Sequence, residues 1–480
     1  MKKIILFLIV TFGLTAFFSY KLIEIPYGIN GDEAWFGYNA TLLSRNLRDE
    51  NNRLLPAFVL SKGGVDYLQP VPVYFMAFVF KLFGPSLYNL RMTAVVTAVA
   101  SVLLIYFLAK ELMGVKGGIV AAIFMATTPI VMIQSHLAFD NMTPLPFIIG
   151  WLFALLKFTK TNNKYWLVIS GALLGISYYS FKSMRIFVPV WTVLTLFYLA
   201  KDWTKKNFKI WITPVIIFGL SVLPFFAVIP WLEFQYAGAV LNKTDPAVTN
   251  IYNFVYNYLA NFDPSFLFIK GDELLIHSTG THGMYLLMSL PFFIIGLIYA
   301  WKKNTFWKLL ILSLFLGPLL FGYIGQVHRA NRLLPEIPAY VLICTTGLLG
   351  LWQKKSNLLT IVLIILFGLN YYNFINYYWN NFADDTKHLY ICYDCKVGAY
   401  KKLKDLSSEF KKTPYIDHVE SKGLDPVRNF VQAIYFKDKL PTWNGESKDF
   451  PVNSVVMTDN AKIDFVKTLG SFDRYYFYTK

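Results

Sequence analysis

The acidic residues of this chain stand beside apolar segments long enough to cross a membrane. Asp32 and Glu33 follow the first apolar stretch, at residues 4–20, and Asp140 lies in the short gap between the predicted third and fourth spans. Ionisable side chains at a membrane boundary are costly and therefore mark candidate functional sites. A carboxylate there can act as a general base toward a hydroxyl, or it can bind a divalent cation. The alternative is a solvated loop that contains an acidic pair.

The composition indicates a membrane protein. Of the 480 residues, 55% are hydrophobic and 18% are aromatic, which leaves too little polar surface to cover a soluble domain. The net charge of +16 does not indicate nucleic-acid binding, because the lysines lie in short loops between apolar spans. The first apolar stretch lacks the small-residue cleavage site of a signal peptide, so we expect an uncleaved helix.

The spacing of apolar residues predicts a mainly α, polytopic membrane protein. A span takes roughly 20 apolar residues, and about eleven such stretches can be placed along the chain. After the first, helices are expected near residues 87–109, 117–134, 142–158, 165–181, 186–200, 210–230, 284–300, 308–325, 333–352 and 357–375. The apolar segment 71–84 is shorter, and we expect a juxtamembrane helix on the outer surface.

Lysine placement predicts the orientation of the spans. With the amino terminus in the cytoplasm, every loop expected inside is lysine-rich, in agreement with the positive-inside rule. These lysines are Lys2, Lys3, Lys110, Lys116, Lys157, Lys160, Lys164, Lys201, Lys205, Lys206, Lys209, Lys302, Lys303, Lys354 and Lys355. An odd number of crossings then leaves the carboxyl terminus outside.

Two parts are expected: a transmembrane module at residues 1–375 and a soluble extracytoplasmic tail at residues 376–480. The module carries outer loops at residues 21–86, 135–141, 231–283 and 326–332. The tail mixes helix-like and strand-like stretches and predicts a small α/β domain. The helix-like stretches are residues 397–410 and 425–435, and the strand-like ones are residues 454–458 and 474–478.

Motifs in the outer loops follow a definite order. GDEAWFGYNA at residues 31–40 leads into a helical pattern that Asp32 could cap, and YLQPVPVY follows at residues 67–74. QSHLAFD occupies residues 134–140, and HRANR occupies residues 328–332. Between them, NFDPSFLF at residues 261–268 precedes Gly-Asp and a histidine. This order resembles the GT-C type integral-membrane glycosyltransferases, specifically the family 39-like branch of protein O-mannosyltransferase and aminoarabinose transferase-like bacterial enzymes.

The resemblance implies the GT-C fold and a sugar donor carried on a polyprenyl phosphate. Transfer would occur at the outer face of the cytoplasmic (inner) membrane, to a protein, lipid or glycan acceptor. By carry-over, Asp32 is the candidate catalytic base. Glu33 and Asp140 would position the acceptor or, with Asp32, hold a metal ion. No cofactor is required by this chemistry, and a divalent metal ion remains an alternative.

Further site residues follow from the same resemblance. Tyr67, Gln69, His136 and Asp272 are candidate substrate-binding residues. Gln69 stands where some relatives carry a charged residue, and His136 stands where an arginine is frequent. Both departures weaken the case for a metal ion and for a particular donor. For Asp272 the alternative is a polar turn that organises its loop.

A polyprenyl phosphate leaves as an anion, so it needs positive charge more than a general acid. Arginine suits phosphate because its planar fork can donate two hydrogen bonds at once. For each arginine the alternative is a side chain that anchors a helix end at the interface, and for the histidine it is a polar turn that organises its loop. The candidates are Arg91, Arg185, His277, Arg329 and Arg332, and Arg332 is preferred to Arg329 because it borders the next span.

Cys392 and Cys395 form a single C-x-x-C pair in the tail. Four-thiolate zinc is excluded because no second pair exists. A thioredoxin-like role is disfavoured because the supporting βαβ pattern is absent. Outside the membrane, a local disulfide is the expected state.

Two other function classes remain as alternatives. A transporter or lipid-linked sugar flippase usually keeps ionisable groups at mid-membrane on broken helices, often in two related halves. Here charged residues are nearly absent from the middle of the spans, and no half-repeat is visible. A glycan polymerase or ligase would depend on outer arginines and a large late loop, without an acidic pair directly after the first helix.

Overall fold

The structure is a computed structural model that describes residues 2–202, 208–241, 250–353, 357–421, 425–446, 449–464 and 466–480. Four of the predicted loop lysines, Lys205, Lys206, Lys354 and Lys355, lie outside these residues. Contacts between residues group the chain into two compact units. Unit 1 comprises Met1–Leu22, Gln69–Pro72 and Arg91–Phe382, and unit 2 comprises Ile23–Leu68, Val73–Leu90 and Ala383–Lys480.

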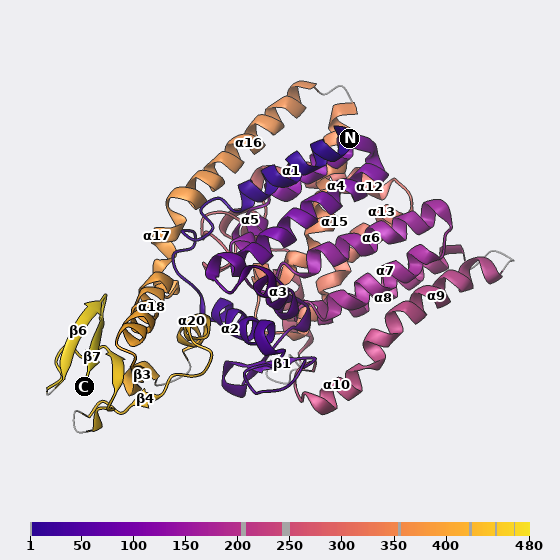
Figure 1. Cartoon of the computed structure of the whole chain (residues 1–480). Helices are drawn as coiled ribbons and strands as arrows, with labels where there is room; N and C mark the ends of the chain where they lie inside the picture. Colours follow the sequence, from indigo (N-terminus) through magenta and orange to yellow (C-terminus); the bar gives the residue numbers. More distant parts are fainter. Residues whose placement is uncertain are drawn as a thin grey trace. The chain divides into compact units, whose positions relative to one another are not determined.

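Unit 1 is a helical bundle (Figure 1). Its helices are α1 (Lys2–Phe18), α4 (Leu87–Ala126), α5 (Pro129–Ser135), α6 (Pro144–Thr161), α7 (Tyr165–Tyr178), α8 (Met184–Leu199), α9 (Phe208–Ala227), α10 (Ile229–Gln235), α11 (Ile251–Ala260), α12 (Leu290–Trp301), α13 (Thr305–Leu316), α14 (Ala330–Leu333), α15 (Ile337–Gln353) and α16 (Asn357–Asn380). α6 packs against α7, α7 also packs against α8 and α9, and α12 packs against α15. Glycines allow the last pair to approach closely, since a Cβ on Gly347 would lie 1.9 Å from the carbonyl oxygen of Phe292.

α4 contains the turn between two predicted spans. It is helical throughout except at Gly114, whose φ of 77° and ψ of −177° lie outside the helical range. A Cβ on Gly118 would lie 2.9 Å from the carbonyl oxygen of Tyr106. A straight helix would place these two residues about 18 Å apart. The chain therefore turns back at Gly114, and two antiparallel helices occupy this region, as the predicted spans 87–109 and 117–134 require.

Ion pairs connect two of the loops predicted to be cytoplasmic. A carboxylate oxygen of Glu111 lies 2.6 Å from Nζ of Lys157, and the other lies 3.1 Å from Nζ of Lys160. The turn after α4's first helix and the end of α6 thus lie at the same end of unit 1. The predicted topology requires both loops to lie at one end of the bundle. The ion pairs do not indicate which face of the membrane that end occupies.

Among the described residues, five helical segments are long and apolar enough to cross a membrane. They are Leu87–Ala126, Trp211–Gln235, Thr305–Tyr323, Ala330–Gln353 and Leu358–Asn380, and shorter apolar helices occur at Ile4–Phe18, Pro70–Phe83, Tyr165–Tyr178, Met184–Leu199 and Leu287–Trp301. These lengths and compositions agree with a multi-pass membrane protein. The number of crossings, about eleven from apolar stretches, remains a prediction.

Unit 2 combines the carboxyl-terminal segment with residues of the first predicted outer loop. Its helices include α2 (Gly31–Asn46), most of α3 (Pro70–Phe83), α18 (Tyr393–Glu409), α19 (His418–Ser421) and α20 (Pro426–Tyr435), with the junction helix α17 (Phe382–Thr386) before α18. α3 confirms the short helix predicted at residues 71–84. β1 (Val59–Ser61) and β2 (Asp66–Leu68) form an antiparallel hairpin.

A five-stranded mixed sheet forms the carboxyl-terminal part of unit 2 (Figure 1). Its strands are β3 (Thr413–Asp417), β4 (Thr442–Trp443), β5 (Ser454–Thr458), β6 (Lys467–Phe472) and β7 (Tyr475–Thr479), in the order β4-β3-β5-β7-β6. β3 is parallel to both β4 and β5, whereas β7 is antiparallel to β5 and β6. Trp443, Phe450, Val456 and Tyr478 form a hydrophobic cluster on the sheet. The strands predicted at residues 454–458 and 474–478 are thus present.

The start of α2 is tied to the segment that precedes α18. Ile29 and Ile391 form an antiparallel bridge, with N–H to O distances of 2.9 and 3.0 Å. Gly28, with φ of 84°, allows this approach, because a Cβ there would lie 2.2 Å from the carbonyl oxygen of Ile391. Cys392, the next residue, forms the expected disulfide with Cys395. The bridge therefore fixes the backbone three residues before Asp32, the first residue of the acidic pair.

Candidate functional site

The first turn of α2 presents the predicted acidic pair. Asn30 is the N-cap: its side chain accepts a hydrogen bond of 2.8 Å from the backbone N–H of Asp32. Oε2 of Glu33 accepts from the backbone N–H of Asn30 at 3.2 Å, which completes a capping box. The prediction that Asp32 caps this helix is wrong. Asn30, which lies two residues earlier and is an equally good cap by residue type, occupies the N-cap position. Glu33 is completely buried.

Asp32 remains accessible on the exposed side of this turn. Its side chain is 55% exposed, and Oδ1 lies 2.8 Å from Nζ of Lys62. Lys62 also lies 3.5 Å from Oδ2 of Asp66. Burial alone would lower the pKa of Lys62, but the carboxylates of Asp32 and Asp66 outweigh burial and raise this pKa. Lys62 is therefore a firmly protonated partner, and Oδ2 of Asp32 has no hydrogen-bond or ion-pair partner among the described residues.

Asn30 and Lys62 are the residues of this site that sequence reasoning missed. Lys62 lies in the hairpin between β1 and β2 and has a φ of 54°, directly before two glycines. The sequence signal that could have indicated Lys62 is a Lys-Gly-Gly turn between two short β-like stretches. Tyr67, predicted to bind substrate, lies on β2 of the same hairpin and packs edge-to-face against Phe58 at 6.3 Å.

Gln69 and Arg185 are brought together in unit 1, although they lie far apart in the sequence. One terminal N–H group of Arg185 donates to Oε1 of Gln69 at 3.0 Å, and another donates to the carbonyl of Val240 at 2.9 Å. Gln69 is completely buried, and its amide nitrogen has no hydrogen-bond partner in the described part of the chain. This pair joins the entry to α3, the start of α8 and the third predicted outer loop.

A second polar cluster joins the predicted second and third outer loops. Nε2 of Gln134 lies 2.9 Å from Nδ1 of His277, and Oε1 of Gln134 accepts from Asn141 at 2.9 Å. His136 is completely buried and stacks edge-on against Tyr378 at 5.5 Å. Asp140, in the same loop, is half-buried. The QSHLAFD motif therefore serves partly to organise its own loop.

Asp272 and Arg329 form a buried pair in unit 1. The Asp272 side chain is fully buried, and its Oδ1 lies 3.3 Å from an N–H nitrogen of Arg329. The backbone N–H groups of Leu274 and Ala330 also donate to it, at 2.9 and 2.8 Å. Burial raises the pKa of Asp272, and these three donors act in the opposite direction. The geometry favours the alternative that Asp272 organises its loop.

The remaining predicted basic residues have internal partners. Arg332 donates to the backbone carbonyl and to Oε1 of Gln326, at 3.2 and 2.8 Å, within its own loop. Arg91 is completely buried and donates to the carbonyl of Leu22 at 3.0 Å. A structural role for Arg91 therefore has direct support. Of the predicted site residues, Asp32, Glu33 and Tyr67 belong to unit 2, and the others belong to unit 1.

The described residues do not fit a metal ion at the predicted position. They contain no group of three or more His, Cys, Asp and Glu side chains that could hold one. A cation at Asp32 would also have to displace the ammonium group of Lys62, which lies 2.8 Å away. What this turn offers instead is a carboxylate whose one oxygen is fixed by a lysine and whose other oxygen can accept a proton.

Two comparisons with protein sequences bear on this site. Residues 69–232 match the family described as "Dolichyl-phosphate-mannose-protein mannosyltransferase". The Bacillus subtilis (strain 168) protein named "Putative mannosyltransferase YycA" is 29% identical over 157 residues, which are 32% of this chain and 22% of that protein. The second match thus covers a minor part of the relative's length.

Solved structures extend the likeness to the fold. The crystal structure of ArnT from Cupriavidus metallidurans bound to undecaprenyl phosphate aligns with a TM-score of 0.57 at 9% identity, over 98% of this chain and 97% of that chain. The apo state of the same protein aligns with a TM-score of 0.58 over the same shares. At this identity the likeness concerns the fold alone. The predicted resemblance to the GT-C membrane glycosyltransferases is confirmed by these matches.

Proposed function

We propose that this chain is a glycosyltransferase that moves a sugar from a polyprenyl-phosphate donor to an acceptor hydroxyl. The exposed carboxylate of Asp32, held on a capped helix start beside Lys62, is the observation that carries the proposal. The fold shared with ArnT supports it, since that protein was crystallised with undecaprenyl phosphate. The family matched by residues 69–232 is named for a lipid-phosphate mannose donor, which supports the same donor class.

Asp32 acts as the general base in this proposal. Oδ2 of Asp32 takes the proton of the acceptor hydroxyl while the acceptor oxygen forms a bond to the anomeric carbon of the sugar. The bond from that carbon to the phosphate oxygen breaks, and the polyprenyl phosphate departs as an anion. Lys62 fixes Oδ1 and so orients the carboxylate. General-base catalysis of this kind contributes about 10²–10⁴-fold to a rate.

Arg185 is the best supported candidate for contact with the departing phosphate. Gln69 and the carbonyl of Val240 hold its guanidinium in one orientation. A fixed planar fork loses little conformational freedom when it binds an anion, which favours bidentate phosphate contacts. His277, held by Gln134, is the second candidate. We place the amino terminus in the cytoplasm and the reaction at the outer face of the cytoplasmic membrane, on the basis of the lysine-rich loops.

Sugar release from a panel of polyprenyl-phosphate sugars tests the proposal. The full chain in nanodiscs would be incubated with each donor and a membrane extract that supplies acceptors, beside Asp32→Asn and Asp66→Asn. Wild type and Asp66→Asn are expected to release sugar from at least one donor, whereas Asp32→Asn is expected to lose at least about 100-fold in rate. Asp66→Asn is the matched control, because Asp66 contacts the same lysine without lying on α2. No release with any donor, while labelled lipid crosses the bilayer, would contradict the proposal and favour a flippase.

A further inference from the structure

The short helix α11 in unit 1 has a reversed polarity. Most of its exposed side chains are apolar or aromatic, and its exposed residues are Ile251, Tyr252, Asn253, Val255, Tyr256 and Leu259. Its buried side chains include Asn257, which is 7% exposed, whereas Ile251 is 76% exposed. A helix that borders water turns its apolar residues inward and its polar residues outward. The exposed side of α11 therefore does not have the composition of a surface that faces water.

Five of these exposed residues share one side of the helix, which we call the α11 face. The α11 face consists of Ile251, Tyr252, Val255, Tyr256 and Leu259. Residues at these spacings lie next to one another along an α-helix, so they form a continuous apolar stripe. The whole helix contains no charged residue.

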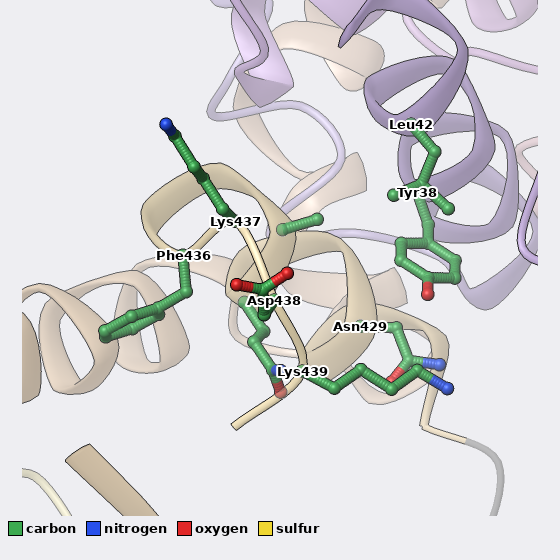
Figure 2. A pocket seen from close by; sticks show the side chains of 9 residues that line it. Tyr38, Leu42, Asn429, Phe436, Lys437, Asp438 and Lys439 are labelled. Atoms are coloured by element: carbon green, nitrogen blue, oxygen red, sulfur yellow. The ribbon is translucent and has the colours of Figure 1, made fainter. Parts of the chain in front are cut away.

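The helix α20 in unit 2 is also ten residues long and shows the ordinary arrangement. Val427, Phe430 and Val431 are buried in it. Its more accessible side carries Asn429, which lines a small pocket beside Tyr38 together with the charged residues that follow α20 (Figure 2). The reversed polarity of α11 is therefore not a general property of short helices in this chain.

The buried side of α11 packs against the end of a membrane-crossing candidate. Its partner is the 3₁₀ helix η5 (Gly317–Tyr323), which forms the last part of the apolar segment Thr305–Tyr323. The side chain of Asn257 donates to the carbonyl of Gly322 at 3.3 Å. A Cβ on Gly322 would lie 2.8 Å from the carbonyl oxygen of Phe254, so the backbones of α11 and η5 approach closely.

Aromatic side chains extend this contact along the same segment. The ring of Phe254 lies 4.7 Å from that of Tyr323, and the ring of Phe262 lies 5.5 Å from that of Phe315. The hydroxyl of Tyr258 donates to the carbonyl of Phe315 at 2.8 Å. α11 thus lies beside the last turns of a segment that has the length and composition to cross a membrane.

This position indicates what covers the α11 face. An exposed apolar patch marks either a protein interface or a contact with the membrane. Beside the end of a membrane span, lipid is already present and needs no partner protein. Tyr252 and Tyr256 also suit this level, because a tyrosine ring is apolar while its hydroxyl can reach the lipid headgroups. An apolar stripe with tyrosines at this level is typical of a helix at the membrane interface.

We propose that α11 is an interfacial membrane helix and that bilayer lipid covers the α11 face. Part of the loop predicted at residues 231–283 is then anchored in the membrane instead of being surrounded by water. α11 leads directly into the NFDPSFLF motif at residues 261–268, so the anchor holds the start of this motif at the membrane surface. The proposal concerns lipid contact alone and does not depend on the transfer chemistry.

Fluorescence quenching tests the proposal in the full-length chain. Tyr252→Cys, Tyr256→Cys and Leu259→Cys would each be labelled with bimane and studied in nanodiscs that contain one chain. Ile365→Cys is the lipid-exposed control, since Ile365 is an exposed residue of the membrane-crossing candidate Leu358–Asn380. Lys404→Cys is the water-exposed control, since Lys404 is an exposed residue of α18 in unit 2.

The unsubstituted chain measures background labelling, because Cys344 is buried and the other two cysteines form a disulfide. Melting temperatures would confirm that the labelled variants are folded. We expect lipids with brominated acyl chains to lower the fluorescence at the three α11 positions as much as at Ile365→Cys. Iodide in the aqueous phase should quench Lys404→Cys and leave the α11 positions almost unchanged.

Three results would overturn the proposal. Iodide quenching at the α11 positions as strong as at Lys404→Cys would show that the α11 face borders water. Shielding from both quenchers would show that protein covers it. Recovery of fluorescence when unbrominated polyprenyl phosphate is added to brominated nanodiscs would assign the α11 face to the donor chain instead of bilayer lipid. Because the label reports contact and not turnover, a chain without transferase activity leaves this test intact.

Discussion

The tripeptide Gly-Asp-Glu occurs twice in this chain with opposite outcomes. At residues 31–33 it begins α2, and there the aspartate is exposed while the glutamate is buried in the capping box. At residues 271–273 it forms a loop in unit 1, and there the aspartate is buried while the glutamate is exposed. The local difference is the glycine: Gly31 is helical, whereas Gly271 has a φ of 79°. That left-handed conformation turns the Asp272 side chain toward Arg329 and two backbone N–H groups.

This contrast separates a carboxylate that can react from one that supports a loop. The oxygens of Asp272 accept from Leu274, Ala330 and Arg329, and no face of the side chain is open to solvent. Asp32 has one oxygen held by Lys62 and a side chain that is 55% exposed. A general base needs an oxygen that a substrate hydroxyl can reach. By that criterion Asp32 qualifies and Asp272 does not.

The largest expected difference between the two sites is in stability. Asp272→Ala leaves Arg329 and two backbone N–H groups without their acceptor in a buried place, and breaking a buried pair in this way costs about 3–5 kcal/mol. Asp32→Ala removes only an exposed ion pair, worth about 0–1 kcal/mol. Thermal unfolding in nanodiscs should show a clear loss for Asp272→Ala and almost none for Asp32→Ala. Equal losses would show that the two carboxylates do not differ in their structural role.

A smaller effect concerns how α2 is held. Gly37→Ala places a methyl group against the ring of Phe430, where contacts of 2.8 Å leave no room. Overpacking of this kind costs about 1–3 kcal/mol. Phe430 stacks on Phe80 and lies 6.2 Å from Tyr393, so its ring cannot easily move aside.

The double variant Gly37→Ala/Phe430→Leu tests this contact. It should lose less stability than the sum of the two single variants, with a coupling of about 0.5–3 kcal/mol. Additive losses would show that Gly37 and Phe430 do not constrain each other. The start of α2, and with it Asp32, would then depend mainly on the bridge between Ile29 and Ile391.

The smallest effect is a dependence on high pH at Lys62. Its pKa is raised in the folded protein above the ordinary 10.5, so its ion pairs contribute stability that is fully present below pH 10.5. That stability is lost as the pH rises through the folded pKa. Because Lys62 is about one-third exposed, we expect less than about 1 kcal/mol. Melting temperatures between pH 9 and pH 12 should fall less steeply for Lys62→Met than for wild type, and parallel curves would contradict the assignment.

Local patterns predicted much of the fold. The strand at residues 454–458 matches β5, and the helix predicted at 425–435 corresponds to α20 with Asp425 as its N-cap. Both are continuous stretches whose own residue types determine their secondary structure. The disulfide between Cys392 and Cys395 also follows from local spacing. The likeness of fold to ArnT covers 98% of this chain and therefore includes the tail. The sequence motifs that carry the resemblance all lie before the tail.

The site was less predictable because its contacts are not local. Asn30 and Asp32 are equally good caps by residue type, so only the backbone decides between them. Lys62 reaches Asp32 through a hairpin turn whose geometry depends on two glycines. Gln69 and Arg185 were each predicted as site residues, but their contact in unit 1 joins residues that are 116 positions apart in the sequence. The pocket beside Tyr38 depends on the packing of α2 against α20, which no single segment encodes.

The most direct test of the account is the transferase rate of Asp32→Asn beside that of Glu273→Gln. Both substitutions neutralise the exposed carboxylate of a Gly-Asp-Glu tripeptide, and neither removes a buried contact. With a donor that supports turnover by wild type, we predict that Asp32→Asn loses at least about 100-fold in kcat, with the KM for the donor unchanged. Glu273→Gln should retain the wild-type rate. Full activity of Asp32→Asn would contradict the central claim that this carboxylate is the base.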